Sequence, residues 1–464
     1  MNSIVSNRQS TAKKVARLVS CLAILTVYSC KTNDDTMIAP VQMDKSPSAS
    51  TLSAEVATKW ADMDLLLIRK STGFSPPVAA RALGYAGLTI YEAVVPGLKT
   101  NKSLAGQLNG LRTLPKIDSS KTYHWGASAN AAAAYIAVNI WANAPDASKK
   151  TVDSLKMALR AGYVKETSEM IVKDSEAYGE SVAKAIFEWS MTDGGHQGYL
   201  RNFPADYQVP IFQGAWQPTE NGRKTPMQPY WGRNRTMVAL NGILPAPVPL
   251  VVSTNQTSTY FKEYNAVYVK NKSLTQAEKE IAVWWADDPS ETFTPPGHSY
   301  NLAKIAVKSS MVKLDKAVEA FARTGIAVND GFIMCWKCKY TFNNERPYTF
   351  VRRAIDPNWI PFWPAPPFPG YISGHASQSA ATAGVLEVVF GNNFAFTDDS
   401  HVGRVKDTKR NVDFKARTYK SFAEAAAESS LSRFLGGIHT MQDNNVGLAE
   451  GQKVAKNINN LKWR

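Results

Sequence analysis

The chain has 464 residues, of which 44% are hydrophobic and 10% aromatic, and its formal net charge at pH 7 is +14. This composition excludes a largely disordered chain, and the length allows two or three ordinary domains or one large domain. The positive charge is compatible with binding to nucleic acid, an acidic polysaccharide or a small anion, or with a merely solubilising surface. Composition alone does not choose among them.

The N-terminus has the features of a bacterial export signal. A polar, basic start is followed by the apolar run LVSCLAILTVYSC, which is too short to span a bilayer comfortably. The last four residues of this run resemble a lipobox, in which the signal is cut before the cysteine and the cysteine is lipidated, although an ordinary signal peptidase cut nearby is an alternative. We predict a signal peptide at 1–29 and a lipidated, Ser- and Pro-rich tether at 30–55. The protein would then be an exported lipoprotein, periplasmic or on the cell surface, anchored at Cys30.

Five segments that follow have apolar residues at three- and four-residue spacing, which is typical of helices packed into a core. They are 54–70, 77–95, 127–144, 149–162 and 168–191. We expect them to form an N-terminal helical bundle over 56–195. Residues 196–260 are rich in Pro, Trp, Asn and Gln, which predicts a long irregular connection.

Helical patterns resume in the second half of the chain. They cover 273–288, 299–325, 326–342, 373–391, 418–437 and 439–461. The first contains Thr275 and Glu278 at the spacing of a capping box. Strand-like alternation is nearly absent, so we predict an all-α fold of two helical bundles, the second over 261–464.

Two cysteines, Cys335 and Cys338, remain in the body of the chain after the N-terminal segment. A four-ligand zinc site would need further partners that the nearby sequence lacks, and no βαβ pattern suggests a thioredoxin-like redox motif. For an exported protein we predict a local disulfide or two thiols one helical turn apart.

The first cluster of candidate site residues is KYTFNNERP, residues 339–347. Lys339 and Arg346 are seven residues apart and fall nearly on one helix face, so they could clamp one anion. The asparagines and the proline indicate that the helix ends near Arg346. The alternative is a pair of cations on a solvated helix face.

The second cluster is Ser373-Gly374-His375, between a Pro- and aromatic-rich loop and a run of small helix-forming residues. The unpaired N–H groups at a helix start favour an anion, and a hydroxyl, a glycine amide and an imidazole there form a compact group for oxyanion binding and acid–base chemistry. A similar PGH at 296–298 shows how readily so short a pattern occurs. We predict that His298 is structural or supports the site from behind.

The third cluster is SRFLGGIHTMQD, residues 432–443. The two glycines break a helix, His439 begins the next one, and Asp443 lies one turn further on the same face. A carboxylate partner fixes the imidazole tautomer and raises the basicity of the other nitrogen, as a coordinating or covalent histidine needs. The alternative is a helix-start histidine with an acid nearby.

The three clusters together, K-x6-RP, SGH and SR-x3-G-x-H-x3-D, resemble the signature shared by vanadium-dependent haloperoxidases and type 2 phosphatidic acid phosphatases. They lie within 339–443, about a quarter of the chain. The resemblance implies a vanadium haloperoxidase/acid phosphatase-like helical fold. The superfamily usually has proline before the serine, where this chain has Ile372. Because that proline donates nothing to an anion, we expect the oxyanion geometry to survive.

The resemblance also implies vanadate as the cofactor and assigns roles at the site. The implied vanadate-binding residues are Lys339, Arg346, Ser373, Gly374, Arg433 and His439. Two arginines and a lysine suit a tetrahedral oxyanion because guanidinium groups bind its oxygens in pairs. His439 would be the axial vanadium ligand supported by Asp443, His375 the acid–base group, and Lys339 the cation that polarises bound peroxide.

The chain is long and has no further predicted membrane span, which favours the haloperoxidase branch of the superfamily. This branch implies hydrogen peroxide and halide as substrates. We expect no nucleic-acid partner, and membrane contact only through the lipid anchor. Trp336 and Phe368 resemble positions that line the halide pocket, although core packing is an alternative. Phenylalanine rather than histidine at 368 resembles chloroperoxidases and bacterial iodoperoxidases. We therefore predict oxidation of iodide to hypohalous acid, with bromide as a second candidate substrate.

Two other classes of function stay open. An exported acid phosphatase with the same site would act through a phosphohistidine at His439, with vanadate as its inhibitor. A basic lipoprotein that binds surface polysaccharide without catalysis would not depend on either motif histidine.

Overall fold

The computed structural model describes residues 46–219 and 223–464. The predicted signal peptide, Cys30 and most of the predicted tether lie outside the described residues. Within them, fourteen α-helices, four short 3₁₀-helices and one two-stranded sheet form the regular structure. The prediction of an all-α fold is confirmed.

The N-terminal half contains five long helices, as the sequence predicts. They are α1 (Glu55–Lys70), α2 (Pro76–Val94), α3 (Trp125–Ile140), α4 (Asp146–Glu166) and α5 (Glu169–Ser190). Prolines open α2, and the Ser168 hydroxyl caps α5 by accepting a hydrogen bond from the Ile171 N–H. Among the described residues, only the segment 76–97 is long and apolar enough to cross a membrane, and 94% of its most apolar window is buried in the protein. This segment is a core helix.

Short helices lie before, between and after the long helices of the N-terminal half. They are the 3₁₀-helices η1 (Ala49–Thr51), η2 (Val95–Gly97), η3 (Gly198–Leu200) and η4 (Trp231–Arg233), and the single-turn helix α6 (Ala239–Gly242). The next helix, α7 (Thr259–Lys272), is capped by the Ser258 hydroxyl and lies before the point where the sequence pattern indicates that helices resume. Its low amphipathicity explains why periodicity alone does not find it.

The C-terminal half supplies the remaining elements. They are α8 (Gln276–Trp284), α9 (Thr294–Ser309), α10 (Leu314–Phe342), α11 (Pro347–Ala354), α12 (Gly374–Phe390), β1 (Phe396–Asp398), β2 (Arg417–Tyr419), α13 (Phe422–Leu435) and α14 (Met441–Asn459). The capping box at Thr275 and Glu278 is present on α8. The two strands pair antiparallel, with Phe396 opposite Tyr419.

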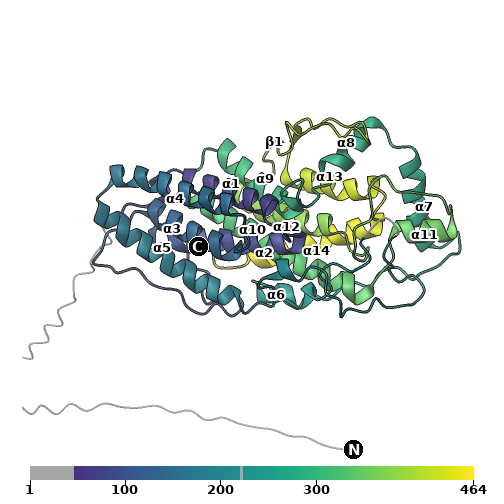
Figure 1. Cartoon of the computed structure of the whole chain (residues 1–464), viewed down its shortest axis with the longest axis horizontal. Coiled ribbons are helices and arrows are strands. Elements are labelled where there is room, and N and C mark those ends of the chain that lie inside the picture. The colour runs from purple at the N-terminus through teal and green to yellow at the C-terminus, as the bar shows by residue number, and fades with distance from the viewer. Residues whose placement is uncertain (1–45, 220–222) are drawn as a thin grey trace, which may run out of the picture. The chain divides into compact units, whose positions relative to one another are not determined.

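The central helix is α10, which packs against α2 of the N-terminal half and α12 of the C-terminal half (Figure 1). Glycine allows the closest approach: a Cβ on Gly87 of α2 would lie 2.4 Å from the Phe321 carbonyl oxygen of α10. One hydrophobic cluster therefore runs through both groups of helices. The limits of the two predicted bundles stay predictions.

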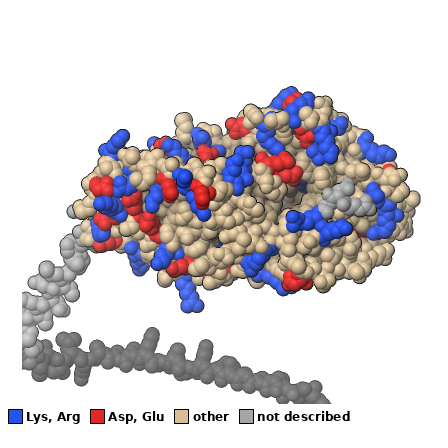
Figure 2. Space-filling view, viewed as in Figure 1, with Lys and Arg blue, Asp and Glu red and all other residues tan. Residues whose placement is uncertain are grey.

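Helix α14 also lies against the start of α12. A Cβ on Gly447 would lie 2.8 Å from the Ala376 Cβ and 2.9 Å from the Ser373 carbonyl oxygen. This contact places the third motif beside the second. On the face drawn in Figure 2, Lys and Arg side chains are interspersed with acidic ones and do not form one continuous basic surface.

Candidate active site

Helix ends bring the three motifs together at one place. Lys339 comes from the last turn of α10, Arg346 from the residue before α11, Ser373, Gly374 and His375 from the start of α12, Arg433 from the last turn of α13, and His439 and Asp443 from the start of α14. Helix starts carry unpaired backbone N–H groups, so this arrangement favours an anion.

Helix α10 stops where the pattern over 326–342 stops and does not continue to Arg346. Helix α10 ends at Phe342, because Asn343 adopts a left-handed conformation with φ of 46° that α-helix cannot continue. Lys339 and Arg346 therefore do not share a helix face. They meet at the site because the chain turns between them.

Lys339 is fully buried and holds the loop that precedes the second motif. Its Nζ donates to the carbonyl oxygens of Pro369, Gly370 and Ile372 at 2.9, 2.9 and 2.6 Å. Burial lowers the pKa of Lys339, while three acceptors around the amine favour its protonated form. The ammonium thus fixes the turn that leads to Ser373. Direct contact of Lys339 with an anion stays a prediction.

Arg346 is buried beside His439. Its Nε donates to the Phe368 carbonyl oxygen at 3.1 Å, and its Nη1 lies 2.9 Å from the Ile438 carbonyl oxygen and 3.0 Å from His439 Nε2. Nη2 is buried and has no hydrogen-bond partner among the described residues. Burial lowers the pKa of Arg346 to about 10, so the group stays charged at neutral pH.

Arg433 is the second buried guanidinium. Its Nη1 donates to the Trp285 carbonyl oxygen at 2.7 Å and lies 3.1 Å from His375 Nε2. Within the described part of the chain, neither Nε nor Nη2 has a partner. An unpaired buried N–H lowers the stability of the fold by about 1–3 kcal/mol, and by more on a charged group. These two nitrogens and Arg346 Nη2 are therefore donors available to a bound anion.

The tautomer of His439 follows from its two partners. Nδ1 lies 3.0 Å from Asp443 Oδ2, and Nε2 lies 3.0 Å from Arg346 Nη1. Because a guanidinium only donates, Nε2 is the acceptor and Nδ1 carries the proton that goes to the carboxylate. Burial and the nearby cations lower the pKa of His439 well below its usual value. His439 is therefore neutral, with a lone pair on Nε2.

Asp443 joins the third motif to the second. Its carboxylate accepts from His439 Nδ1 and, at 3.1 Å, from the Thr440 N–H in a capping box that opens α14. Its backbone carbonyl oxygen accepts from the Ser373 N–H at 3.0 Å. Burial raises the pKa of this carboxyl. The predicted contact between Asp443 and His439 is confirmed, although α14 begins at Met441, two residues later than predicted.

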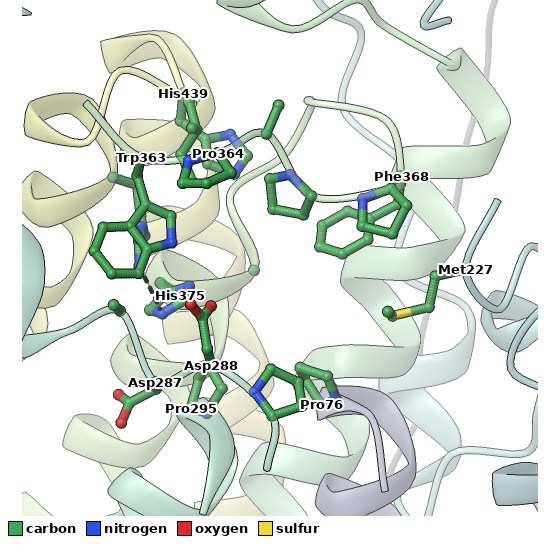
Figure 3. Close-up of a pocket in the computed structure, with 18 of the residues that line it drawn as sticks. Pro76, Met227, Asp287, Asp288, Pro295, Trp363, Pro364, Phe368, His375 and His439 are labelled. Atoms are coloured by element: carbon green, nitrogen blue, oxygen red, sulfur yellow. Dashed lines mark hydrogen bonds between the residues drawn. The ribbon is translucent and has the colours of Figure 1, made fainter. Parts of the chain in front are cut away.

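A cavity of about 280 Å³ opens beside these groups (Figure 3). Its wall includes Trp336 and Phe368, whose ring centroids are 5.0 Å apart, and Lys339 Nζ lies 5.2 Å from the Phe368 centroid. His375 and His439 also line it. The two aromatic residues predicted for a halide pocket thus border the cavity, next to cations that interact with their ring faces.

Several residues of the same cavity lie outside the three sequence motifs. They include Asp288, which follows α8, and Trp363 with the prolines after it. Burial raises the pKa of Asp288 to about 6, although Arg433 nearby opposes this shift. The acidic pair after α8 was included in a predicted helix, where a turn could have been expected from the proline that follows at 289.

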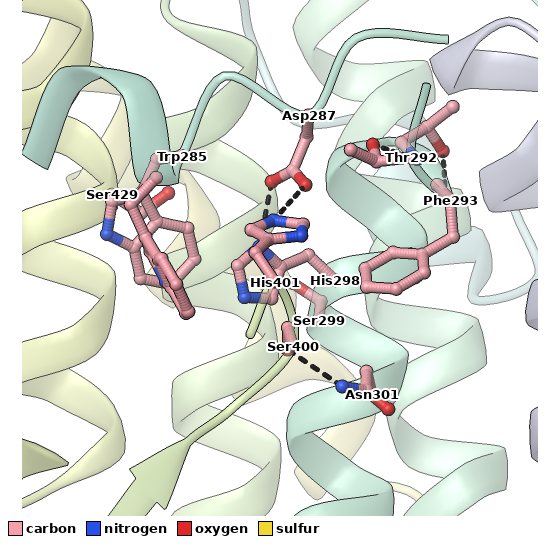
Figure 4. A network of polar contacts seen from close by, with 12 residues as sticks. Trp285, Asp287, Thr292, Phe293, His298, Ser299, Asn301, Ser400, His401 and Ser429 are labelled. Atoms are coloured by element: carbon pink, nitrogen blue, oxygen red, sulfur yellow. Dashed lines mark hydrogen bonds and ion pairs between the residues drawn. The ribbon is translucent and has the colours of Figure 1, made fainter. Parts of the chain in front are cut away.

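Beside the cavity lies a cluster that we call the buried histidine network: Asp287, His298, Asp398 and His401. Figure 4 shows Asp287, His298 and His401. His298 lies between two carboxylates, with Nδ1 2.8 Å from Asp287 Oδ2 and Nε2 2.8 Å from Asp398 Oδ2. Burial alone would lower the pKa of His298, but the two carboxylates raise it to about 10. His298 is thus a charged structural histidine.

Cys335 and Cys338 are both buried and unbonded thiols in α10. Of the two predicted states, the structure shows the thiols. Cys335 Sγ lies 3.6 Å from the Ile372 carbonyl oxygen, in the loop that Lys339 also holds.

Both the sequence and the fold are similar to those of known proteins. In a crystal structure of the first bacterial vanadium-dependent iodoperoxidase, 32% of aligned residues are identical, the TM-score is 0.77, and the alignment covers 88% of this chain and 96% of that one. The chain belongs to the vanadium-dependent haloperoxidase family. A family model described as the VCPO second helical-bundle domain matches residues 319–462, which include all three motifs.

Two more distant proteins are also similar to this chain, one in fold and one in sequence. A holo-type bacterial vanadium-dependent chloroperoxidase has a TM-score of 0.64 at 14% identity, over 84% of this chain and 92% of that one. Vanadium chloroperoxidase of Curvularia inaequalis is 27% identical over 199 residues, 35% of this chain. That match spans about a third of the fungal protein's length.

The residues present fit a vanadate ion. Three buried guanidinium nitrogens lack partners among the described residues, and they belong to the two arginines that contact His375 and His439. The neutral His439 Nε2 offers a lone pair of the kind that metals coordinate. An oxyanion would satisfy the unpaired arginine nitrogens, and His439 Nε2 would bind vanadium once Arg346 Nη1 turns from this nitrogen to the anion.

Proposed function

We propose that this protein is a vanadium-dependent haloperoxidase that oxidises iodide with hydrogen peroxide to hypohalous acid, with bromide as a second candidate substrate. The observation that carries the proposal is a set of three buried N–H nitrogens, on Arg346 beside His439 and on Arg433 beside His375, that have no partner within the described residues. In a desolvated pocket such donors bind a tetrahedral oxyanion more strongly than in water.

When bound, vanadate supplies a Lewis acid that binds hydrogen peroxide and makes it electrophilic toward halide. Arg346 Nη2 and the unpaired Arg433 nitrogens stabilise the negative charge on the oxygens of the anion. Asp443 keeps the proton of His439 on Nδ1, so that Nε2 stays available as a ligand. Lys339 adds positive charge and fixes the turn before Ser373.

His375 is the group that moves protons in this proposal. Burial, together with the charge of Arg433, lowers the pKa of His375 well below its usual value. The ring is therefore neutral at pH 7 and able to take a proton from an incoming peroxide. Its position on the cavity wall gives it access to a ligand there.

Iodide is the halide favoured by the cavity and by the similarity to an iodoperoxidase. The wall beside the anion pocket is formed mainly by aromatic and proline side chains. Moving a halide ion from water to a site against such a wall costs hydration free energy. This cost is smallest for iodide, which is large and weakly hydrated. The cations against the Phe368 ring offset part of that cost.

The test is halide oxidation by the purified mature chain, residues 31–464, with hydrogen peroxide and iodide or bromide, before and after addition of orthovanadate. We expect iodide turnover that depends on vanadate, and its loss in His439→Ala but not in His196→Ala. A phosphate ester assay without vanadate runs in parallel. Ester hydrolysis inhibited by vanadate, without halide turnover, would assign the same pocket to a phosphatase with a phosphohistidine.

We further infer that the chain is exported and anchored through lipid on Cys30, with no other membrane contact. The apolar run before this cysteine supports the proposal. Incorporation of a labelled fatty acid into the wild-type chain, and its absence from Cys30→Ser, would support the anchor. A soluble, unlabelled wild-type protein would contradict it.

A further inference from the structure

One backbone carbonyl connects His375 and Arg433. The Trp285 carbonyl oxygen lies 2.9 Å from His375 Nε2 and 2.7 Å from Arg433 Nη1. Trp285 is the C-cap residue of α8, 90 residues before His375 in the chain. A residue outside all three motifs therefore orients one motif residue from each of two helices.

The two neighbours of His375 Nε2 make opposite demands on its protonation. A carbonyl only accepts, so the Trp285 contact needs a proton on Nε2, whereas a guanidinium only donates and would need a lone pair there. The Arg433 contact with His375 is the longer one at 3.1 Å, and the same Nη1 already donates to the carbonyl at 2.7 Å. The geometry thus favours Nε2–H. Within residues 46–219 and 223–464, no hydrogen bond engages His375 Nδ1.

The ring of Trp285 is held on two sides. It stacks on His298, with ring centroids 4.4 Å apart and an interplanar angle of 22°. Its Nε1 donates to Glu428 Oε1 at 3.0 Å, and Glu428 is itself bound by Arg417 and Tyr419 of strand β2. The stacking partner is the central residue of the buried histidine network.

The buried histidine network also holds the backbone just after Trp285. Asp287, two residues later, has a left-handed φ of 52°, and its Oδ1 lies 2.9 Å from His401 Nε2 while its Oδ2 contacts His298. A left-handed aspartate is strained unless its surroundings hold it. In Figure 4 the Asp287 side chain points at the imidazoles, and Trp285 lies to their left.

We propose that the buried histidine network positions the Trp285 carbonyl, which keeps His375 protonated on Nε2 and makes Nδ1 the nitrogen that exchanges a proton with the ligand in the cavity. His298 and His401 are positioning residues, because they act on His375 only through residues 285–287. The inference deepens the proposed function, since it concerns the acid–base group of the same site. The tautomer itself is a property of the chain and does not depend on which substrate turns over.

A metal site would be another interpretation of these side chains. One ligand atom from each of Asp287, His298 and His401 lies within 4.8 Å of the others. Zinc bound to such atoms at about 2.0–2.1 Å would need lone pairs directed at a common centre. Instead, both nitrogens of His298 and Nε2 of His401 lie 2.8–2.9 Å from carboxylate oxygens, in hydrogen bonds that use those nitrogens.

The direct test is ¹⁵N NMR of the full mature chain labelled on histidine, without vanadate. The chain has six histidines, so the ring signals can be assigned by comparison with single variants such as His375→Gln. We expect a protonated Nε2 and an unprotonated Nδ1 for His375. The opposite pattern would overturn the tautomer without touching the proposed activity.

The positioning role of the buried histidine network is tested with two variants of His401. His401→Ala removes the donor to Asp287 Oδ1, whereas the side-chain amide of His401→Gln can still donate to it. We expect a second His375 tautomer and about 10-fold weaker vanadate binding by calorimetry, without peroxide, in His401→Ala, and near wild-type behaviour in His401→Gln. The Tm of each variant shows that it is folded.

Two results would overturn the positioning role. One is a folded His401→Ala with the wild-type His375 spectrum and vanadate affinity. The other is an equal change in both His401 variants, which would indicate a loss of packing only. If His401→Ala does not fold, His298→Gln replaces it, because this change removes the ring that stacks on Trp285 and contacts Asp287. A folded His298→Gln with the wild-type His375 spectrum and vanadate affinity would also overturn the role.

Discussion

The two histidines of the pocket are oriented in different ways. His439 is fixed by Asp443, which lies four residues further along the chain and forms a charged hydrogen bond to the ring. His375 is fixed by the Trp285 carbonyl, which comes from a distant helix end and is neutral. The first arrangement raises the basicity of the free nitrogen, as suits a metal ligand, and the second leaves a weaker base, as suits a proton-transfer group.

The largest effect is expected at the ligand itself. His439→Ala removes the nitrogen that would bind vanadium, so vanadate affinity should fall by more than the roughly 10–100-fold typical for loss of a partner of a ligating histidine. Isothermal titration calorimetry with orthovanadate measures this, with His196→Ala as the control. An unchanged dissociation constant would remove His439 from the site.

The carboxylate side of the comparison is tested by Asp443→Asn. The amide no longer stabilises a proton on Nδ1, so vanadate affinity should drop about 10–100-fold while the fold survives. The matched control is Thr440→Ala, which removes the cap of α14 and should cost about 1 kcal/mol of stability without a comparable loss of affinity. Equal losses of affinity in both variants would show that Asp443 acts only through the cap.

The support of His375 by the Trp285 carbonyl depends on His298, whose charge is tested by the pH dependence of stability. The pKa of His298 rises from 6.5 to about 10 on folding, so the folded state binds the proton more tightly than the unfolded state. Its contribution to stability is complete below about pH 6.5 and is lost as the pH rises toward 10. The Tm should therefore fall more steeply over this range in the wild type than in His298→Gln. Parallel curves would show that His298 is not charged.

The smallest effect is expected on the cavity wall, which both histidines share. Phe368→Leu keeps an apolar side chain but removes the ring that faces Lys339 and Arg346. We expect kcat/KM for iodide to fall by a factor that corresponds to about 0.5–1 kcal/mol, with vanadate affinity unchanged. Phe390→Leu, in an aromatic cluster elsewhere, is the control. A loss of vanadate affinity would assign Phe368 to the anion pocket instead.

The same contrast shows what could be predicted from the sequence. The helices, the three motifs and the Asp443–His439 pair depend on short spacings, and periodicity or motif order finds them. The end of α10 at Phe342 coincides with the end of the pattern over 326–342. The expectation that Lys339 and Arg346 share a helix face is wrong, because Asn343 turns the chain in a left-handed conformation. Helix α7 was missed because its apolar residues are not on one face.

The support of His375 could not be predicted, because it joins segments that are far apart in the sequence. The buried histidine network combines residues from 287 to 401, placed in loops and at helix ends where no periodicity exists. Only His298 drew attention, through its likeness to the second motif. Its two carboxylate partners become visible only when the chain has folded.

The three buried cations of the site are held mainly by the main chain. The acceptors are the carbonyl oxygens of Pro369, Gly370, Ile372, Phe368, Ile438 and Trp285. Neutral acceptors hold a cation in place without cancelling its charge, so the positive potential remains available to an anion. Every residue has a backbone carbonyl, so these hydrogen bonds do not depend on the identity of the side chain at that position. Ile372, where the superfamily usually has proline, still provides its carbonyl oxygen to Lys339.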